Sequence, residues 1–228
     1  MFNWVSHLRR TSAIKKKAPK SGNSLSVSSN RQMDVDHSDN CMKYLIVGLG
    51  NPGSEYANTR HNIGFDTLDV LANTEKLAWD DVKHGKTCSF RMKGKTVVLL
   101  KPSTFMNLSG KALNYWMQQE KISIENVLVI VDDLALPLGT LRIKPKGSDA
   151  GHNGLKNIHE VLGHTNYARL RFGIGNDFPR GRQVDFVLGK WSEQERIELS
   201  LRIDIACEMV KSFVAIGLQG TMTAFNNK

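Results

Sequence analysis

Residues 44–53, YLIVGLGNPG, join a short apolar run to a glycine-rich turn. The run predicts a buried strand, and the glycines match the G-x-G-x-x-G pattern of dinucleotide-binding loops letter for letter. In that fingerprint a helix opens at the glycines, and an acidic residue closes a second strand about 20 residues later. Here Pro52 marks a turn, and the candidate acid, Glu75, lies just past the first predicted helix. The pattern therefore favours a strand-to-loop turn that presents Asn51 over a pyrophosphate-binding loop.

Strands and helices alternate outward from this turn. Strands are expected at residues 44–49, 88–92, 96–100, 127–131, 140–144, 167–173 and 184–188, with a hairpin at 93–94. Helices are expected at residues 65–72 and 111–120, and a capping box at 192–195 is expected to open a long amphipathic helix through Ile197, Leu201, Ile205, Met209 and Phe213. Helices between buried strands predict an α/β fold: a single-domain layer sandwich with a mixed, mostly parallel, twisted sheet flanked by helices.

Length and composition narrow the class of protein. A chain of 228 residues corresponds to one domain with a tail, or to two small domains at most. No apolar run reaches the roughly 18 residues of a membrane-spanning helix. Three cysteines without a C-x-x-C motif argue for a reducing compartment and against a disulfide framework or a zinc knuckle. We therefore expect a cytoplasmic protein.

Residues 1–41 differ from the rest of the chain. They are rich in Ser, Asn and Lys, have no acid before Asp34, and carry +4 of the net charge of +9. Such a segment buries too little apolar surface to fold. It is interpreted as a leader before a natural start at Met42, or alternatively as an organellar transit peptide. The remaining +5 on residues 42–228 suits a polyanionic partner, but also suits many other proteins.

Polar side chains follow several predicted strands. Asn51, Asn107 and Asp132 come after three of them, and Asn153 lies in the glycine-rich loop after a fourth. His61, at the start of the first predicted helix, is the titratable base within reach. Taken singly, each has a plainer role, because Asn and Asp are common turn and cap residues. Their joint placement at the carboxyl ends of strands, where α/β sheets bind ligands, is what suggests a site.

Other chemistries fail on spacing. The chain has no G-x-S-x-G motif for a nucleophilic serine, and residues 94–96 resemble the end of a P-loop whose first glycine is replaced by Ser89. The histidines of residues 159–164 lie five apart and would not share a helix face, so we expect no metal. A histidine base, a carboxylate and neutral amides remain. This set suits attack of water on an ester and needs no cofactor.

Residues 42–228 closely resemble the bacterial-type peptidyl-tRNA hydrolases. The resemblance rests on GLGNPG at 48–53, Tyr56, TRHNIG at 59–64, KPSTFMNLSG at 101–110, DDL at 132–134, LP at 136–137, GHNGL at 151–155 and RLR at 169–171. It implies a monomeric enzyme without a cofactor that cleaves the ester between a peptide and the 3′ ribose of tRNA. Such an enzyme recycles tRNA from stalled translation.

The resemblance also implies roles for individual residues. His61 corresponds to the general base, Asp132 to the carboxylate that orients it, and Asn51 to the residue that helps to distinguish blocked from free aminoacyl groups. Contacts to the tRNA end and the peptide are implied for Tyr56, Phe105, Asn107 and Asn153, with Asn107 also supporting the ester carbonyl. Contacts to acceptor-stem phosphates are implied for Arg142, Lys144 and Arg171.

Two departures from the family pattern affect the expected tRNA surface. Ala135 replaces a common acid, and residues 148–150, Ser-Asp-Ala, replace glycines and place Asp149 near a phosphate-facing loop. The first alternative function is a non-catalytic RNA-binding relative of the hydrolases. A nucleotide-dependent oxidoreductase is a more distant alternative.

Overall fold

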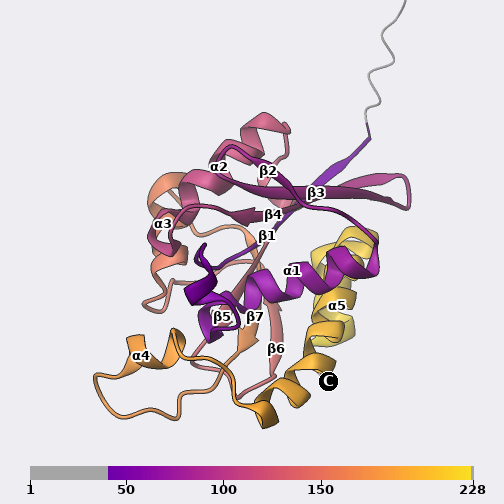
Figure 1. Ribbon diagram of the computed structural model, residues 1–228. Coiled ribbons are helices and arrows are strands. Elements are labelled where there is room, and N and C mark those ends of the chain that lie inside the picture. Colours follow the sequence, from indigo (N-terminus) through magenta and orange to yellow (C-terminus); the bar gives the residue numbers. More distant parts are fainter. Residues whose placement is uncertain (1–40, 227–228) are drawn as a thin grey trace, which may run out of the picture. The chain divides into compact units, whose positions relative to one another are not determined.

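The computed structural model describes residues 41–226, which contain one seven-stranded sheet with helices on both faces (Figure 1). The expectation of an unfolded leader at residues 1–41 lies outside the described residues except at Cys41. The strands are β1 (Lys43–Gly48), β2 (Asp80–Val82), β3 (Gly85–Met92), β4 (Lys95–Pro102), β5 (Val127–Asp133), β6 (Leu141–Lys144) and β7 (Ala168–Gly173). The α-helices are α1 (Ile63–Thr74), α2 (Ser109–Gln119), α3 (Asn153–Leu162), α4 (Gln183–Val187) and α5 (Glu193–Phe225). Short 3-10 helices are η1 (Ser54–Tyr56), η2 (Arg60–Asn62), η3 (Met106–Leu108) and η4 (Ile124–Asn126).

The strand order β2-β3-β4-β1-β5-β7-β6 confirms the predicted mixed α/β sheet. The central strands β4, β1, β5 and β7 are parallel, whereas the β3–β4 hairpin and the β6–β7 pair are antiparallel. The chain pairs β1 with β4 on one side and with β5 on the other, so the strand order reverses at β1. Ligands in open α/β sheets bind at the carboxyl ends of the strands beside such a reversal.

The two faces of the sheet are packed differently at its β6–β7 end. In the centre both faces are apolar: Ile46 of β1 packs on the side of α1 and α5, and Val47 on the side of α2 and α3. On β6 and β7 the face on the side of α1 and α5 stays apolar, whereas the opposite face is basic. The apolar residues are Leu141, Ile143, Leu170 and Phe172, and the alternating basic residues are Arg142, Lys144, Arg169 and Arg171. The strand period thus builds a cationic face at one end of the sheet.

The glycines of the opening stretch let α1 pack against the end of β1. A Cβ atom on Gly48 would lie 2.2 Å from the carbonyl oxygen of Gly64, and one on Gly64 would lie 2.4 Å from the backbone nitrogen of Leu49. Two backbones therefore touch, which only glycine permits. The turn itself uses Gly53, with φ of +114°. Because two 3-10 turns separate Gly53 from the start of α1, these glycines serve packing and a turn, not a helix N-terminus facing a pyrophosphate.

Two local predictions are wrong. Residues 184–188 lie mostly in the helix α4, not in a strand, because a short apolar run does not specify its period. Helix α5 begins at the predicted capping box, but Ile197 and Leu201 are each 68% exposed. Residues four apart advance about 40° around a helix, so the predicted series drifts off one face. Among the helices of residues 41–226, none combines the length and apolar character needed to cross a bilayer.

Candidate active site

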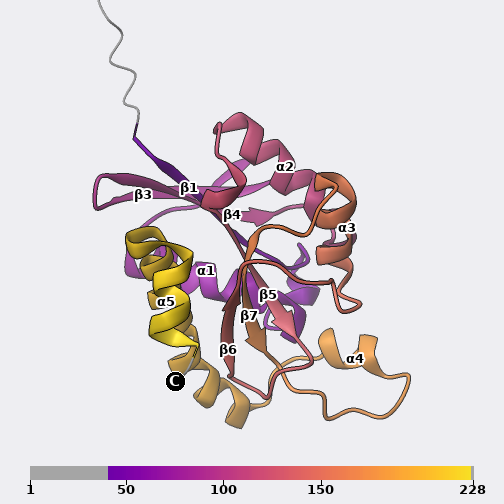
Figure 2. The same cartoon turned by 180° about the vertical axis from the view of Figure 1, so that it is seen from behind.

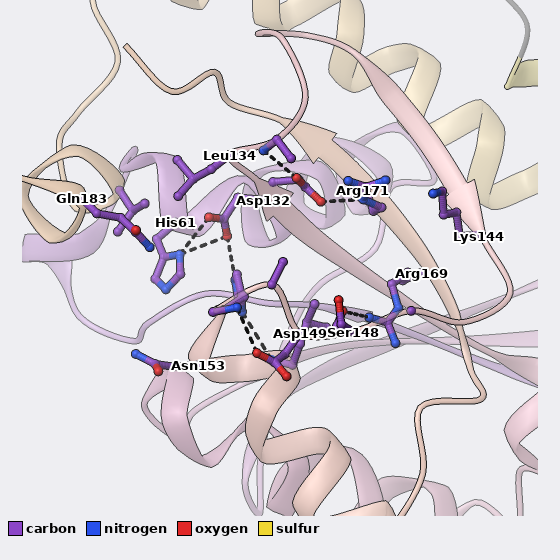
Figure 3. Close-up of a pocket in the computed structure, with 18 of the residues that line it drawn as sticks. His61, Asp132, Leu134, Lys144, Ser148, Asp149, Asn153, Arg169, Arg171 and Gln183 are labelled. Carbon is purple, nitrogen blue, oxygen red and sulfur yellow. Dashed lines mark hydrogen bonds and ion pairs between the residues drawn. The ribbon is translucent and has the colours of Figure 1, made fainter. Parts of the chain in front are cut away.

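The carboxyl end of β5 brings Asp132 to His61, which lies on η2 just before α1 (Figure 3). The Nδ1 atom of His61 lies 3.0 Å from each carboxylate oxygen of Asp132. The Asp132 side chain is 3% exposed and that of His61 is 12% exposed. An ionised carboxylate can only accept hydrogen bonds, so Nδ1 carries the proton. The other ring nitrogen, Nε2, is left with a free lone pair, as a general base requires.

A second histidine contacts the same carboxylate. The Nε2 atom of His152 lies 3.0 Å from Oδ1 of Asp132, and its Nδ1 accepts the backbone N–H groups of Gly154 and Leu155 at 3.1 and 3.3 Å. Backbone N–H groups can only donate, so Nδ1 of His152 is unprotonated and Nε2 donates to Asp132. Sequence reasoning assigned His152 no role. The available signal was a histidine at the N-cap of a helix, immediately before the predicted Asn153.

Burial, charge and hydrogen bonding together set the pKa values of His61 and Asp132. Burial by itself lowers the pKa of His61, but the charge of Asp132 and the hydrogen bond between them outweigh it, and the pKa is raised above 6.5. Burial alone would raise the pKa of Asp132, but the two histidines and their hydrogen bonds hold it well below its usual range. Asp132 is therefore ionised at neutral pH, and His61 becomes a free base only above the ordinary histidine pKa.

His61, Asp132 and His152 are also the kinds of residue that bind metals, and their ligand atoms lie within 4.8 Å of one another. The nitrogen–oxygen separations of 3.0 Å within this group are hydrogen-bond distances. Every one of these bonds has a donor and an acceptor, so the trio is complete as a hydrogen-bonded unit. The expectation of no metal stays a prediction.

Asn51 is held in one orientation by two other residues. Asn62 clamps its backbone: Oδ1 of Asn62 accepts the N–H of Asn51 at 2.8 Å, and Nδ2 donates to its carbonyl at 3.0 Å. The side-chain Oδ1 of Asn51 accepts the N–H of Met106 at 2.8 Å. That contact fixes the amide, because a backbone N–H must face oxygen. The Nδ2 group of Asn51 has no acceptor among residues 41–226 and remains available to a ligand.

We call the cavity beside Asn51 the amide pocket. It has a volume of about 230 Å³ and is lined by Asn51, His61, Phe105, Met106, Asn107, Asn153, Val184, Val187 and Leu188. It thus brings together three predicted asparagines, Phe105 and the predicted base. One wall comes from helix α4 and is apolar. Tyr56, in η1, is not among the lining residues, so the structure does not bring this predicted residue to the pocket.

We call a second cavity, which shares His61, Asn153, Val184 and Val187 with the amide pocket, the cationic pocket. It has a volume of about 340 Å³ and includes His61, Asp132, Lys144, Lys146, Arg169 and Arg171 among its lining residues (Figure 3). Arg171 forms an ion pair with Asp133. Arg142 does not line the cavity, although it lies on the same face of β6 as Lys144, and its Nη1 donates to the carbonyl of Leu141. Two of the three predicted phosphate contacts thus share a cavity with the base.

The loop that borders the cationic pocket is held in place from within. Arg169 is 2% exposed, and its Nη1 and Nη2 donate to the carbonyls of Ser148 and Thr165 at 2.9 and 3.3 Å. The carboxylate of Asp149 accepts the N–H of Gly151 at 2.9 Å, and this bond, the largest cause, lowers the pKa of Asp149. The unusual Asp149 therefore shapes the turn that precedes His152, at the edge of the basic surface.

Arg60, next to the base, ties η2 to the apolar wall of the amide pocket. Its guanidinium lies 4.4 Å from the ring centre of Phe186 in α4 and 4.9 Å from that of Trp191. It also forms an ion pair of 2.8 Å with Glu195 at the start of α5. Sequence reasoning assigned Arg60 no role, because its partners are more than 100 residues away along the chain.

Comparisons with known proteins agree on one family. The family profile described as peptidyl-tRNA hydrolase matches residues 45–228. The chain is 61% identical to a peptidyl-tRNA hydrolase of Bacteroides fragilis and 59% identical to one of Phocaeicola vulgatus, each over 82% of this chain and 100% of the relative. A crystal structure of peptidyl-tRNA hydrolase from Acinetobacter baumannii matches with a TM-score of 0.75 and 37% identity, over 80% of this chain and 94% of that chain.

Proposed function

The chain belongs to the peptidyl-tRNA hydrolase family, and we propose that it hydrolyses the ester between a peptide and the 3′ ribose of tRNA. One observation supports this most directly: His61, hydrogen-bonded to Asp132, lines both the amide pocket and the cationic pocket. An ester placed at His61 would have its acyl part among neutral amides and its nucleic acid part beside positive charges. Peptidyl-tRNA likewise has a peptide on one side of its ester and an anionic nucleic acid on the other.

His61 acts as the general base in this proposal. Its Nε2 takes a proton from water while the water oxygen bonds to the ester carbonyl carbon, and the carbonyl oxygen becomes negatively charged. The bond to the ribose 3′ oxygen then breaks, and the proton on Nε2 passes to that oxygen. Asp132 keeps the Nδ1 proton in place and stabilises the transient imidazolium. His152 donates to the same carboxylate and so holds Asp132 in position.

The fixed amide of Asn51 gives a physical reason for choosing blocked substrates. Its free Nδ2 is a donor, which suits the carbonyl oxygen of an N-acyl group or peptide bond. A free aminoacyl group presents an ammonium there, which also donates and so finds no partner. Leaving such a charged group unpaired in a pocket costs about 1–3 kcal/mol or more. Asn107 and Asn153 offer further amides to the ester and the peptide.

The cationic pocket is proposed to bind phosphates of the tRNA acceptor end. Lys144 and Arg171 line it, and their charges would attract a backbone without reading its sequence. We further propose a monomer that acts in the cytoplasm on tRNA from stalled translation. Neither a cofactor nor a metal enters the proposed chemistry.

The test is release of N-acetyl-aminoacyl groups from tRNA, measured beside unblocked aminoacyl-tRNA and the His61→Ala variant. The proposal expects rapid cleavage of the blocked form alone, and its loss in the variant. Equal inertness of wild type and variant, with tRNA still bound, would replace the hydrolase with a non-catalytic RNA-binding protein. Cleavage that persists in His61→Ala would leave the reaction in place but remove His61 as its base.

A further inference from the structure

Helix α5 is not one continuous helix. Gly217 has φ of +78° and ψ of 176°, outside helical values. Before and after it, the hydroxyls of Ser212 and Thr221 lie 2.9 Å apart. In an unbroken helix, residues nine apart are separated by about 13.5 Å along the axis. The chain therefore reverses at Gly217, and Figures 1 and 2 both show the end of α5 returning beside β6.

In the returning segment, the side chain of Asn226 forms two hydrogen bonds with the backbone of β6. Oδ1 of Asn226 accepts the N–H of Ile143 at 2.9 Å, and Nδ2 donates to the carbonyl of Ile143 at 2.8 Å. Strand β6 is at the edge of the sheet, with β7 as its partner. The outward N–H and C=O groups of an edge strand have no neighbouring strand to pair with. A carboxamide carries the same donor and acceptor as a peptide group. The side chain of Asn226 therefore gives Ile143 the two hydrogen bonds that a neighbouring strand would otherwise provide.

This contact lies between two residues of the cationic face. Arg142 and Lys144 flank Ile143 on β6. The side chain of Ile143 is fully buried in the core, so those of its two neighbours project from the opposite face. A strand of only four residues with a single partner strand is prone to fraying. By fixing the backbone at Ile143, Asn226 fixes the two points from which these cations extend.

We propose that Asn226 is a positioning residue for tRNA, which acts by holding β6 so that Arg142 and Lys144 meet the phosphates together. This inference rests on the proposed function, because it assumes that the cationic face binds tRNA. It assigns Asn226 no contact with the substrate and no part in the chemistry.

The experiment compares Asn226→Ala with a matched control, Thr223→Ala. Thr223 lies on the same returning segment, and among residues 41–226 its hydroxyl bonds only within α5, to the carbonyl of Gln219. Each variant is assayed on N-acetyl-aminoacyl-tRNA and on a short N-acetyl-aminoacyl-CCA trinucleotide, which keeps the ester but lacks the acceptor stem. Direct tRNA binding is measured over a series of salt concentrations, and thermal unfolding verifies the fold.

For Asn226→Ala we expect KM for the tRNA substrate to rise about fivefold, corresponding to the net value of about one hydrogen bond, with kcat unchanged. The slope of binding against salt should fall by about 1 for each phosphate that the variant no longer neutralises. The short substrate and the control should behave as in wild type. Wild-type KM and salt slope in Asn226→Ala would overturn the inference, as would an equal loss on both substrates. If wild type cleaves neither substrate, the proposed function fails, and tRNA binding alone decides the role of Asn226.

Discussion

The amide pocket and the cationic pocket adjoin the same histidine, but they are built in different ways. In the amide pocket, neutral side chains are held by backbone groups, as Asn51 is by Met106. In the cationic pocket, Lys144 is an exposed side chain on the edge strand β6. A hydrogen bond from a fixed amide depends on geometry and hardly on salt, whereas a phosphate contact is screened by ions. Variants in the two pockets should therefore have different effects. The amide pocket controls which acyl group is cleaved, and the cationic pocket controls how tightly tRNA is held.

The largest effect is expected at His61, which lines both pockets. His61→Ala should lower kcat by about 10²–10⁴-fold, because the base is lost, while tRNA binding stays as in wild type. Single-turnover hydrolysis and direct tRNA binding measure the two quantities. His164→Ala is a matched control, because His164 is exposed and lines neither pocket. A normal kcat in His61→Ala would show that His61 is not the general base.

Asp132→Asn should lower kcat by about 10²-fold, because the neutral amide neither stabilises the imidazolium nor fixes the Nδ1 proton. Activity should rise with pH as His61 loses its proton, and in wild type this rise is centred above 6.5 because the pKa is raised. Without the charge of Asp132 the effect of burial remains, so the rise should move to lower pH. A pH profile of kcat/KM tests this, and an unmoved profile would contradict the role of Asp132.

Asn51→Asp alters only the amide pocket. The carboxylate still accepts from Met106, but the free donor becomes an acceptor that suits an ammonium group. We expect the preference for blocked over free aminoacyl-tRNA to fall about tenfold or more, judged by the ratio of kcat/KM values. Salt dependence of tRNA binding should not change. If the preference survived, the free Nδ2 group would not be the source of selectivity.

Lys144→Ala alters only the cationic pocket. KM should rise about threefold to fivefold and the salt slope should fall by about 1, with kcat and the preference for blocked substrates unchanged. Lys156→Ala, an exposed charge on α3 that does not line the pocket, serves as the control. A change in kcat in Lys144→Ala would show that the two pockets are not separable.

The smallest effect is expected from a chelator. Because His61, Asp132 and His152 satisfy one another by hydrogen bonds, removal of metal ions should leave kcat unchanged. The measurement is hydrolysis after dialysis against EDTA. A loss of activity that zinc restores would show that these three residues bind a metal ion.

Much of the fold could be predicted from local pattern. The strand at β1, the β3–β4 hairpin and the helices α1 and α2 follow from apolar periods and turn residues within a few positions. The pairing of His61 with Asp132 was implied by family resemblance, and the position of Asp132 at a strand end agreed with it. Prediction was wrong at residues 184–188, where five residues are too few to distinguish a helix from a strand.

The sequence by itself determined most of the central strands and the helices α1 and α2, the turn at Gly53 and the set of polar residues that end the strands, because these depend on neighbours along the chain. Tertiary structure decided the rest. The second bond to Asp132 from His152, the clamp of Asn62 on Asn51, and the contact of Asn226 with β6 each join residues 11 to 83 positions apart. Such contacts depend on how elements pack in three dimensions, which the spacing of residues along one strand or helix does not encode.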